Sequence, residues 1–285
     1  MNGTISTDDT IITVYLSQDK DILDNSNYYE FKAITGADVK LFEGESLIQQ
    51  LVESESGTYK SALYPEPGKT YSISAGKNGF ESIVAQTTIP VDAPIVVINS
   101  MSIRPTEYGG ENIRLSYSIN DKPGKDYYEI KLYALYRYEE TYYDEDLDSI
   151  IVIESNANWE EWWYTKVGAD LDEFEENSED YTLSDELFNG RPKEFLIEFD
   201  KPYSYSYYEG MENHSDTSQF KLVVKKLNEE YYQYLVSSQL QYDVDGSPFS
   251  EPVQVYSNVQ NGYGILSSYH PVEMPFAIYD DKLLK

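Results

Sequence analysis

Apolar and polar residues alternate in short runs through residues 11–90, and turn residues separate the runs. Alternation with a period of two places the apolar side chains on one face of a β-strand, and regularly spaced strands are typical of a β-sandwich. The pattern predicts strands over Ile11–Leu16, Val39–Phe42, Leu47–Val52, Thr58–Ala62, Thr70–Ala75 and Ile83–Ile89.

The same alternation returns in the second part of the chain. Ile113, Leu115, Tyr117 and Ile119 alternate with polar neighbours, as expected for one buried face of a strand. Antiparallel pairing is the simplest assembly of such strands. The strands predicted here are Ile95–Ile103, Ile113–Ile119, Tyr128–Tyr138, Phe195–Phe199 and Phe220–Leu227.

Two segments have the helical rather than the strand period. Residues 228–240 begin with Asn228 as a capping residue, followed by two glutamates, which favours a helix start. In residues 158–167, Trp159, Trp162 and Trp163 have the i, i+3, i+4 spacing that places side chains on one side of a helix. We therefore expect one or two helices in a mainly β fold.

A linker separates the two β-rich parts. Pro90 and Pro94 cannot donate to a strand ladder, and each biases the residue before it toward an extended backbone. A chain of 285 residues also suits two hydrophobic cores. We predict an N-terminal sandwich over residues 1–90 and an antiparallel β-rich domain over residues 91–285.

The charge of the chain excludes one class of partner. Its 51 acidic and 21 basic residues give a formal net charge of −30, which repels a phosphate backbone, so we expect no nucleic-acid binding. Residues 139–186 alone carry 18 acidic residues and one lysine, and we interpret them as an acidic insertion. The sequence contains no cysteine and no apolar run long enough to span a bilayer.

Aromatic residues of the acidic segment form the first candidate site. Trp159, Trp162, Trp163 and Tyr164 would make a platform for a sugar ring or an apolar ligand, because rigid rings bury a large area at little entropic cost. An amphipathic helix presents the same stripe to a core, so core packing is the competing and favoured interpretation.

Asp144, Asp146 and Asp148 form the second candidate, since alternating carboxylates supply oxygen ligands for calcium. The loop lacks the central glycine and the final glutamate of an EF-hand, which favours a solvated turn. No nucleophile elbow is present, and only two histidines occur in the sequence. We expect no cofactor. A pair of carboxylates for glycoside hydrolysis stays open, because 51 acidic residues allow many pairs.

Turn residues in both parts of the chain carry two family resemblances. Residues 36–39, 57–59, 67–71 and 79–80 resemble the turns of small Ig-like sandwiches of the transthyretin and carboxypeptidase-regulatory class. In residues 247–269, Val253 and Val255 alternate before Asn261-Gly262, which predicts a strand and a tight hairpin. That segment, together with residues 5–9, 36–39 and 87–90, resembles the domain-of-unknown-function 4249 family of Bacteroidota lipoproteins.

The resemblance implies a noncatalytic, lipid-anchored protein of the outer membrane or cell surface. It implies a TonB-dependent receptor as partner and an accessory role in uptake, with a small molecule, peptide or glycan as a possible ligand. Contact with the membrane would come only through a lipid anchor on a leader that this sequence does not contain. A carboxylate-dependent hydrolase and a calcium-binding structural adhesin are the alternative functions.

Overall fold

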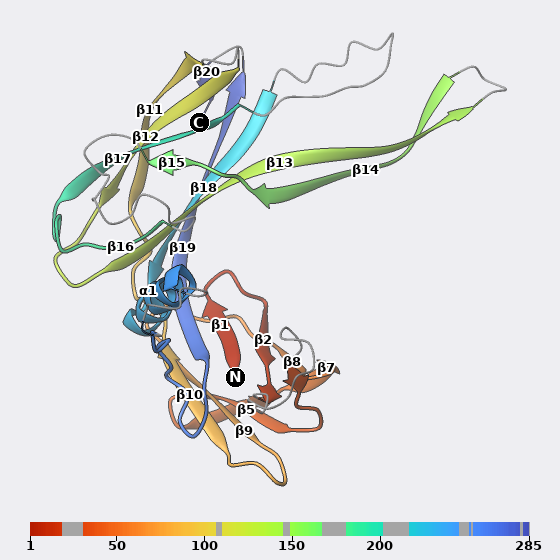
Figure 1. Cartoon of the computed structure of the whole chain (residues 1–285), viewed down its shortest axis with the longest axis vertical. Helices are drawn as coiled ribbons and strands as arrows, with labels where there is room; N and C mark the ends of the chain where they lie inside the picture. The colour runs from red at the N-terminus through yellow and green to blue at the C-terminus, as the bar shows by residue number, and fades with distance from the viewer. Residues whose placement is uncertain are drawn as a thin grey trace.

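The structure is a computed structural model that describes residues 1–18, 31–106, 110–144, 149–166, 181–201, 217–244, 251, 253–279 and 282–284. Within these residues the chain forms twenty β-strands and one α-helix (Figure 1). The sheets are almost entirely antiparallel. The prediction of a mainly β, antiparallel protein is therefore confirmed.

Two layers of strands make up the N-terminal unit. One layer follows the order β1-β2-β8-β7 and the other the order β10-β9-β5-β6. The alternation predicted from the sequence is visible in β9, where Tyr71, Ile73 and Ala75 are buried and their neighbours are not. The strands are β1 (Asn2–Ser6), β2 (Ile11–Tyr15), β5 (Asp38–Glu43), β6 (Ser46–Gln50), β7 (Val52–Glu55), β8 (Thr58–Ala62), β9 (Thr70–Gly76) and β10 (Ile83–Thr88), with the short pair β3 (Ser17–Gln18) and β4 (Lys32–Ala33) beside them.

The C-terminal unit packs a second sheet, of order β11-β12-β17-β15, against the longer strands of the main sheet. Ile113, Leu115, Tyr117 and Ile119 of β12 are fully buried between these layers, as their alternation predicts. The strands of this unit are β11 (Val96–Pro105), β12 (Glu111–Asn120), β13 (Tyr127–Asp144), β14 (Ser149–Glu161), β15 (Thr165–Lys166), β16 (Tyr181–Ser184), β17 (Pro192–Asp200), β18 (Thr217–Leu227), β19 (Ile265–Tyr279) and β20 (Lys282–Leu284).

Strand β19 belongs to both units. Its first five residues pair in parallel with β1, and residues 269–279 pair antiparallel with β18. One continuous ten-stranded sheet therefore runs from the lower unit of Figure 1 into the upper one. The first apolar core ends at Ile89 before the linker and the second begins at Val96, but Val259 and Leu266 return to the first core. The division into two domains stays a prediction.

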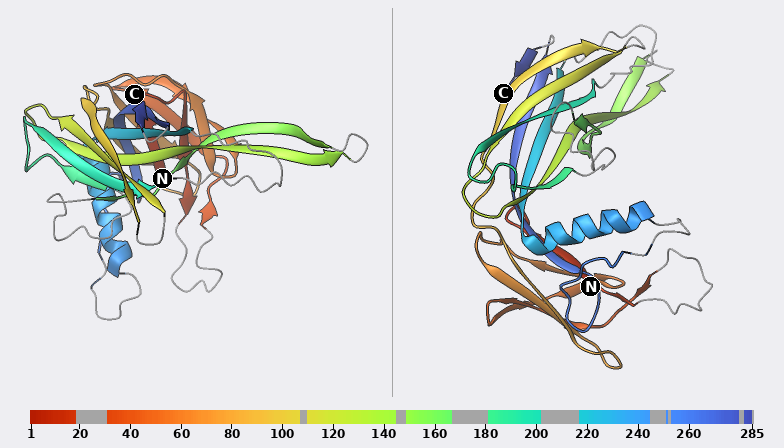
Figure 2. Two further views of the ribbon diagram at one scale, coloured as in Figure 1. Left: turned by 90° about the horizontal axis from the view of Figure 1, so that it is seen from above. Right: turned by 60° about the vertical axis from the view of Figure 1, so that its left-hand side comes forward.

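The acidic segment begins within β13 and continues in β14, and these two strands form a long hairpin. β13 and β14 pair over most of their length and extend well beyond the body of the molecule (Figures 1 and 2). β14 lies at the end of the ten-stranded sheet. The predicted helix over residues 158–167 is wrong, because Trp159 pairs with Leu135 in this hairpin and residues 165–166 form β15. Pairing with β13 satisfies the backbone of these aromatic residues, which suit strands as well as helices.

The other predicted helix is confirmed as α1 (Glu229–Val244). Asn228 caps it, since its side-chain Oδ1 accepts a hydrogen bond from the backbone amide of Tyr231 at 3.2 Å. Helix α1 lies in the crease between the two units (Figure 2, right). It contains no fully buried residue, so its position depends on its ends and on the segment that follows it.

The strand predicted around Val253 and Val255 is wrong. Residues 253–259 have no strand partner, and side chains of α1 hold their backbone instead: Val253 N donates to Gln241 Oε1 and Tyr256 N donates to Ser237 Oγ. The predicted turn residue Asn261 does have a positive φ of 59°. Only Gln260 bridges to β10, through Val84, before β19 begins.

Candidate functional site

A cleft of about 880 Å³ lies between the N-terminal unit, helix α1 and the closing segment 254–264. One wall comes from the ends of β1, β3 and β9 and the turn after β9, and the other from Tyr234 of α1 and residues 254–257. A cavity of this size is in the range that holds a small molecule or a short peptide.

Side chains rather than a strand ladder position the closing segment along the cleft. Asn258 is the central residue: its Nδ2 donates to the backbone oxygens of Gln86 and Leu266, and its Oδ1 accepts from the amide of Leu266. The amide of Asn261 likewise donates to the backbone oxygen of Ser82. These bonds tie the segment to β10 and β19, so its shape is fixed by a few amide side chains.

Five aromatic residues give the cleft its apolar character. Tyr263 and Phe80 are 72% and 43% exposed and mark the rim, where they are open to a ligand. Burial raises the pKa of Tyr256 above its usual range, and its hydroxyl, like that of any neutral tyrosine, can donate a hydrogen bond. The aromatic lining residues are Phe31, Phe80, Tyr234, Tyr256 and Tyr263.

Charged groups are few in this cleft. Lys77 and Glu81 are the charged side chains among the described residues that line it, and the Lys77 ammonium lies 5.9 Å from the centre of the Phe80 ring. Asn2, Gln18, Gln254, Ser257 and Asn261 provide amide and hydroxyl groups. The cleft can therefore stack an apolar group and form neutral hydrogen bonds, with one cation and one anion to orient a ligand.

A family model described as "Domain of unknown function (DUF4249)" matches residues 1–274. The chain belongs to the DUF4249 family. No curated protein matches the sequence. The resemblance inferred from residues 5–9, 36–39, 87–90 and 247–269 is thus confirmed at the level of the family.

In this DUF4249 protein the four predicted aromatic residues do not share one surface. Trp162 and Tyr164 pack against the C-terminal core, and Trp162 Nε1 and Tyr164 OH donate to the backbone oxygens of Asp200 and Ile130. Trp159 and Trp163 are 39% and 68% exposed. Neighbouring residues of an extended segment point to opposite sides, so the strand geometry separates the group that helical spacing would have joined.

One face of Trp159 is occupied by a cation. The Lys221 ammonium lies 5.2 Å from the Trp159 ring centre and 5.4 Å from that of Tyr133, and it also pairs with Glu273 at 2.8 Å. None of the four aromatic residues lines the cleft. Ligand binding by Trp159 and Trp163 stays a prediction, whereas the contacts of Trp162 and Tyr164 favour the core interpretation.

The predicted calcium ligands fall largely outside the description. Asp144 is the last residue of β13, while Asp146 and Asp148 lie outside the described residues. A different group of carboxylates comes together where the loop between β12 and β13 meets the loop between β16 and β17. Asp121, Asp126 and Asp185 each place one oxygen within 4.8 Å of the others, and we call them the carboxylate trio.

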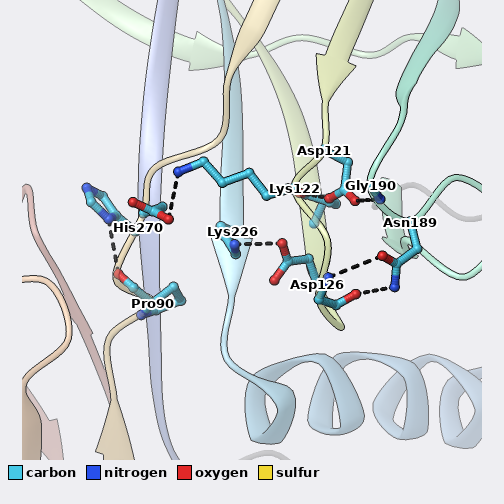
Figure 3. Close-up of polar contacts among 11 residues, drawn as sticks. Pro90, Asp121, Lys122, Asp126, Asn189, Gly190, Lys226 and His270 are labelled. Carbon is cyan, nitrogen blue, oxygen red and sulfur yellow. Dashed lines mark hydrogen bonds and ion pairs between the residues drawn. The ribbon is translucent and has the colours of Figure 1, made fainter.

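Hydrogen bonds fix two members of the trio (Figure 3). Asp121 accepts from the backbone amide of Gly190 at 2.7 Å, and Asp126 accepts from the Lys226 ammonium at 2.7 Å. Asp121 also accepts from the Tyr128 hydroxyl at 2.5 Å. Burial, with the charges of Asp121 and Asp126, raises the pKa of Asp185 above the usual aspartate range. Sequence reasoning missed this trio, because only the pairing of β13 with β16 brings Asp185 to the other two.

Proposed function

We propose that the protein is a noncatalytic binding protein whose cleft holds a small molecule, a peptide or a glycan. The observation that carries this proposal is the lining of the cleft, in which five aromatic residues and several amide groups surround one lysine and one glutamate. Aromatic surfaces with a few oriented polar groups are the usual composition of a ligand site. Rigid aromatic rings also lose little conformational entropy on binding.

The same lining weighs against the hydrolase alternative. A carboxylate-dependent glycoside hydrolase needs two carboxyl groups on either side of the scissile bond. Glu81 is the one carboxylate that the described lining contributes, and no histidine accompanies it there. The cleft thus supplies groups that bind and orient a ligand without supplying a catalytic pair.

We assign the protein, as part of this proposal, to the surface of the outer membrane through a lipid anchor. A TonB-dependent transporter is the proposed receptor. The family resemblance supports both assignments. No helix in the described residues is both long enough and apolar enough to cross a membrane. The projecting β13–β14 hairpin, with exposed Trp159 and Trp163 near its base, offers a receptor contact separate from the cleft.

The finer fold assignment of the N-terminal unit is part of the same proposal. We assign it to the Ig-like sandwiches of the transthyretin and carboxypeptidase-regulatory class. Two facing antiparallel layers around one apolar core support this assignment. Positive φ angles at Gly36, Gly57, Gly68 and Gly79, which are turn residues of the resemblance, also support it.

The ligand proposal is tested at the rim of the cleft. The purified chain is incubated with separate mixtures of peptides, oligosaccharides and small metabolites, and retained compounds are identified by native mass spectrometry. Phe80→Ala combined with Tyr263→Ala should weaken binding of a retained compound about tenfold or more, since exposed aromatic anchors dominate such contacts. The control Tyr64→Ala removes an equally exposed aromatic residue outside the cleft. No retained compound, or equal loss in both variants, would refute cleft binding.

The receptor proposal has its own test. A tagged chain should co-purify with a TonB-dependent transporter from native outer membranes, and Trp159→Ala with Trp163→Ala should reduce this without lowering the thermal midpoint. Tyr242→Ala, another exposed aromatic residue, is the matched control. A fall in thermal midpoint of the tryptophan variant would assign these residues to the core instead, and co-purification equal to wild type would exclude them as the contact.

A further inference from the structure

Asp185 is the least compensated carboxylate in the described part of the chain. Its side chain is in a residue only 1% exposed, and both carboxylate oxygens are buried without a hydrogen-bond partner. The backbone amides of Asp126 and of Asp185 itself lie close enough to oppose the rise of its pKa, but neither forms a well-directed hydrogen bond to it. Burial of an unpaired carboxylate is costly, so this group calls for a positive partner.

The surroundings of Asp185 are negative. Asp121 and Asp126 complete the trio, and Lys226, bound to Asp126, is the cation that the described residues place in contact with it. The nearby Lys122 and Lys125 pair elsewhere, with Asp92 and Glu229. Three carboxylates and one lysine leave two negative charges, which a divalent cation would balance.

The spacing of the trio fits calcium. Calcium binds oxygen at about 2.3–2.6 Å, so ligands on opposite sides of one ion lie about 5 Å apart. The three oxygens lie within 4.8 Å of one another, and all are hard carboxylate ligands. Because calcium accepts irregular geometry and completes its shell with water or carbonyl oxygens, it suits three ligands contributed by two loops.

We propose that Asp121, Asp126 and Asp185 bind a calcium ion that joins the β12–β13 loop to the β16–β17 loop. The site lies where the two units meet. Lys122 in the first loop pairs with Asp92 of the linker at 2.8 Å, and Lys125 pairs with Glu229 in the first turn of α1 at 2.7 Å. Calcium bound here stabilises the loop that contacts both the linker and the helix.

The full chain, freed of metal with a chelator and dialysed, is titrated with calcium chloride by calorimetry. We expect a dissociation constant on the order of 10⁻⁴ to 10⁻³ M, the range of extracellular calcium modules. At saturating calcium the thermal midpoint should rise by about 5 °C, because the ion binds the folded state alone. Terbium, used as a luminescent calcium substitute, should be sensitised by Tyr128, whose hydroxyl contacts Asp121.

The decisive variant is Asp185→Asn, which keeps the shape of the side chain and removes its charge. It should weaken calcium binding at least about tenfold and abolish both the midpoint shift and the trio-dependent terbium signal. Glu186→Gln changes the exposed neighbouring residue and should behave as wild type, which controls for diffuse attraction to an acidic surface. If Asp185→Asn folds poorly, Asp126→Asn is measured in the same way.

Three results would overturn the proposal. One is the absence of a calcium isotherm in the wild-type chain up to about 10 mM, well above the range of extracellular sites. Another is a calcium response in Asp185→Asn or Asp126→Asn equal to that of wild type. Tighter binding of magnesium than of calcium would also refute the assignment to calcium.

Discussion

The two units of the molecule bury different kinds of polar groups. In the described part of the N-terminal unit the buried polar residues are hydroxyl-bearing, such as Ser6, Ser61 and Thr87. In the C-terminal unit three carboxylates, those of Asp121, Glu129 and Asp185, are buried among the described residues. Hydroxyl groups find partners within a sheet at little cost, whereas a buried carboxylate needs a cation or several donors.

The buried carboxylates of the C-terminal unit differ in whether a donor or a cation compensates their charge. Glu129 pairs with Lys225 at 2.5 Å, and Asp121 accepts two hydrogen bonds, so two of the three buried carboxylates are compensated. Asp185 is not. At the cleft, aromatic side chains of the N-terminal unit, of α1 and of the closing segment line the site instead. The cleft thus offers an apolar site for a ligand, and the C-terminal unit offers an anionic site for an ion.

Core truncation should have the largest effect and tests whether the two units are separate. Phe220→Ala removes a buried ring that stacks on Phe276 and contacts Phe199, and should cost about 3–5 kcal/mol. Ile73→Ala, in the other core, should cost about 3 kcal/mol. Because β19 pairs with strands of both units within one sheet, we expect both variants to lower one common urea transition. Two transitions, each sensitive to one variant, would show independent domains.

Asn228 links the units and should have the next largest effect. Its Nδ2 donates to Thr87 Oγ1 of the N-terminal unit at 2.9 Å, and its Oδ1 accepts from the amides of Tyr231 and Ser268. Asn228→Ala should cost about 2 kcal/mol in urea unfolding, since it removes a helix cap and buried bonds. Asn228→Ser retains a capping hydroxyl and should recover about half of that loss. Equal costs for the two variants would mean that capping contributes nothing.

The smallest effect concerns an ion pair inside the C-terminal unit. The amide of Asn112 and the guanidinium of Arg114 hold the pKa of Glu198 below its ordinary 4.5. A lowered carboxyl pKa adds stability that is complete above pH 4.5 and is lost as pH falls through the folded-state pKa. Glu198→Gln should therefore be about 1 kcal/mol less stable than wild type at pH 7 and nearly equal to it at about pH 3.

This pH prediction has a matched control. Glu45→Gln changes an exposed turn residue of the N-terminal unit and should leave the pH dependence of urea unfolding as in wild type. A Glu198→Gln deficit that is the same at both pH values would point to lost packing rather than to the charge.

The local pattern of apolar and polar residues predicted most strands but not the full length of β19. Residues 58–62 form a strand with the predicted bounds, and Asn228 begins a helix as its position suggests. Strand β19 was missed beyond its first residues, because Pro271 and Pro275 argue against a strand. Pairing of β19 with β1 ends at Tyr269, and its pairing with β20 begins at Ala277. At both prolines β19 therefore has β18 as a neighbour on one side only. The missing amide hydrogens of the prolines cost no ladder bond there.

The sites were harder to predict because they depend on contacts between distant segments. The cleft is built from residues within 1–18 and 31–83, from Tyr234 of α1 and from residues within 254–264, and no single segment of it carries a motif. The spacing of the three tryptophans fits a helix, and only pairing with β13 shows that the segment of Trp159 is a strand. The carboxylate trio likewise depends on strand pairing. The density of charge along the sequence indicates only the acidic segment.

Strand β19 also has a mechanical consequence. If the linker at Pro90–Pro94 were the sole connection, the two units could rotate relative to each other. Here such a rotation requires rupture of the hydrogen bonds between β1 and β19. This pairing opposes a change in the orientation of the cleft relative to the projecting hairpin. A receptor bound to the hairpin would therefore also set the direction in which the cleft faces.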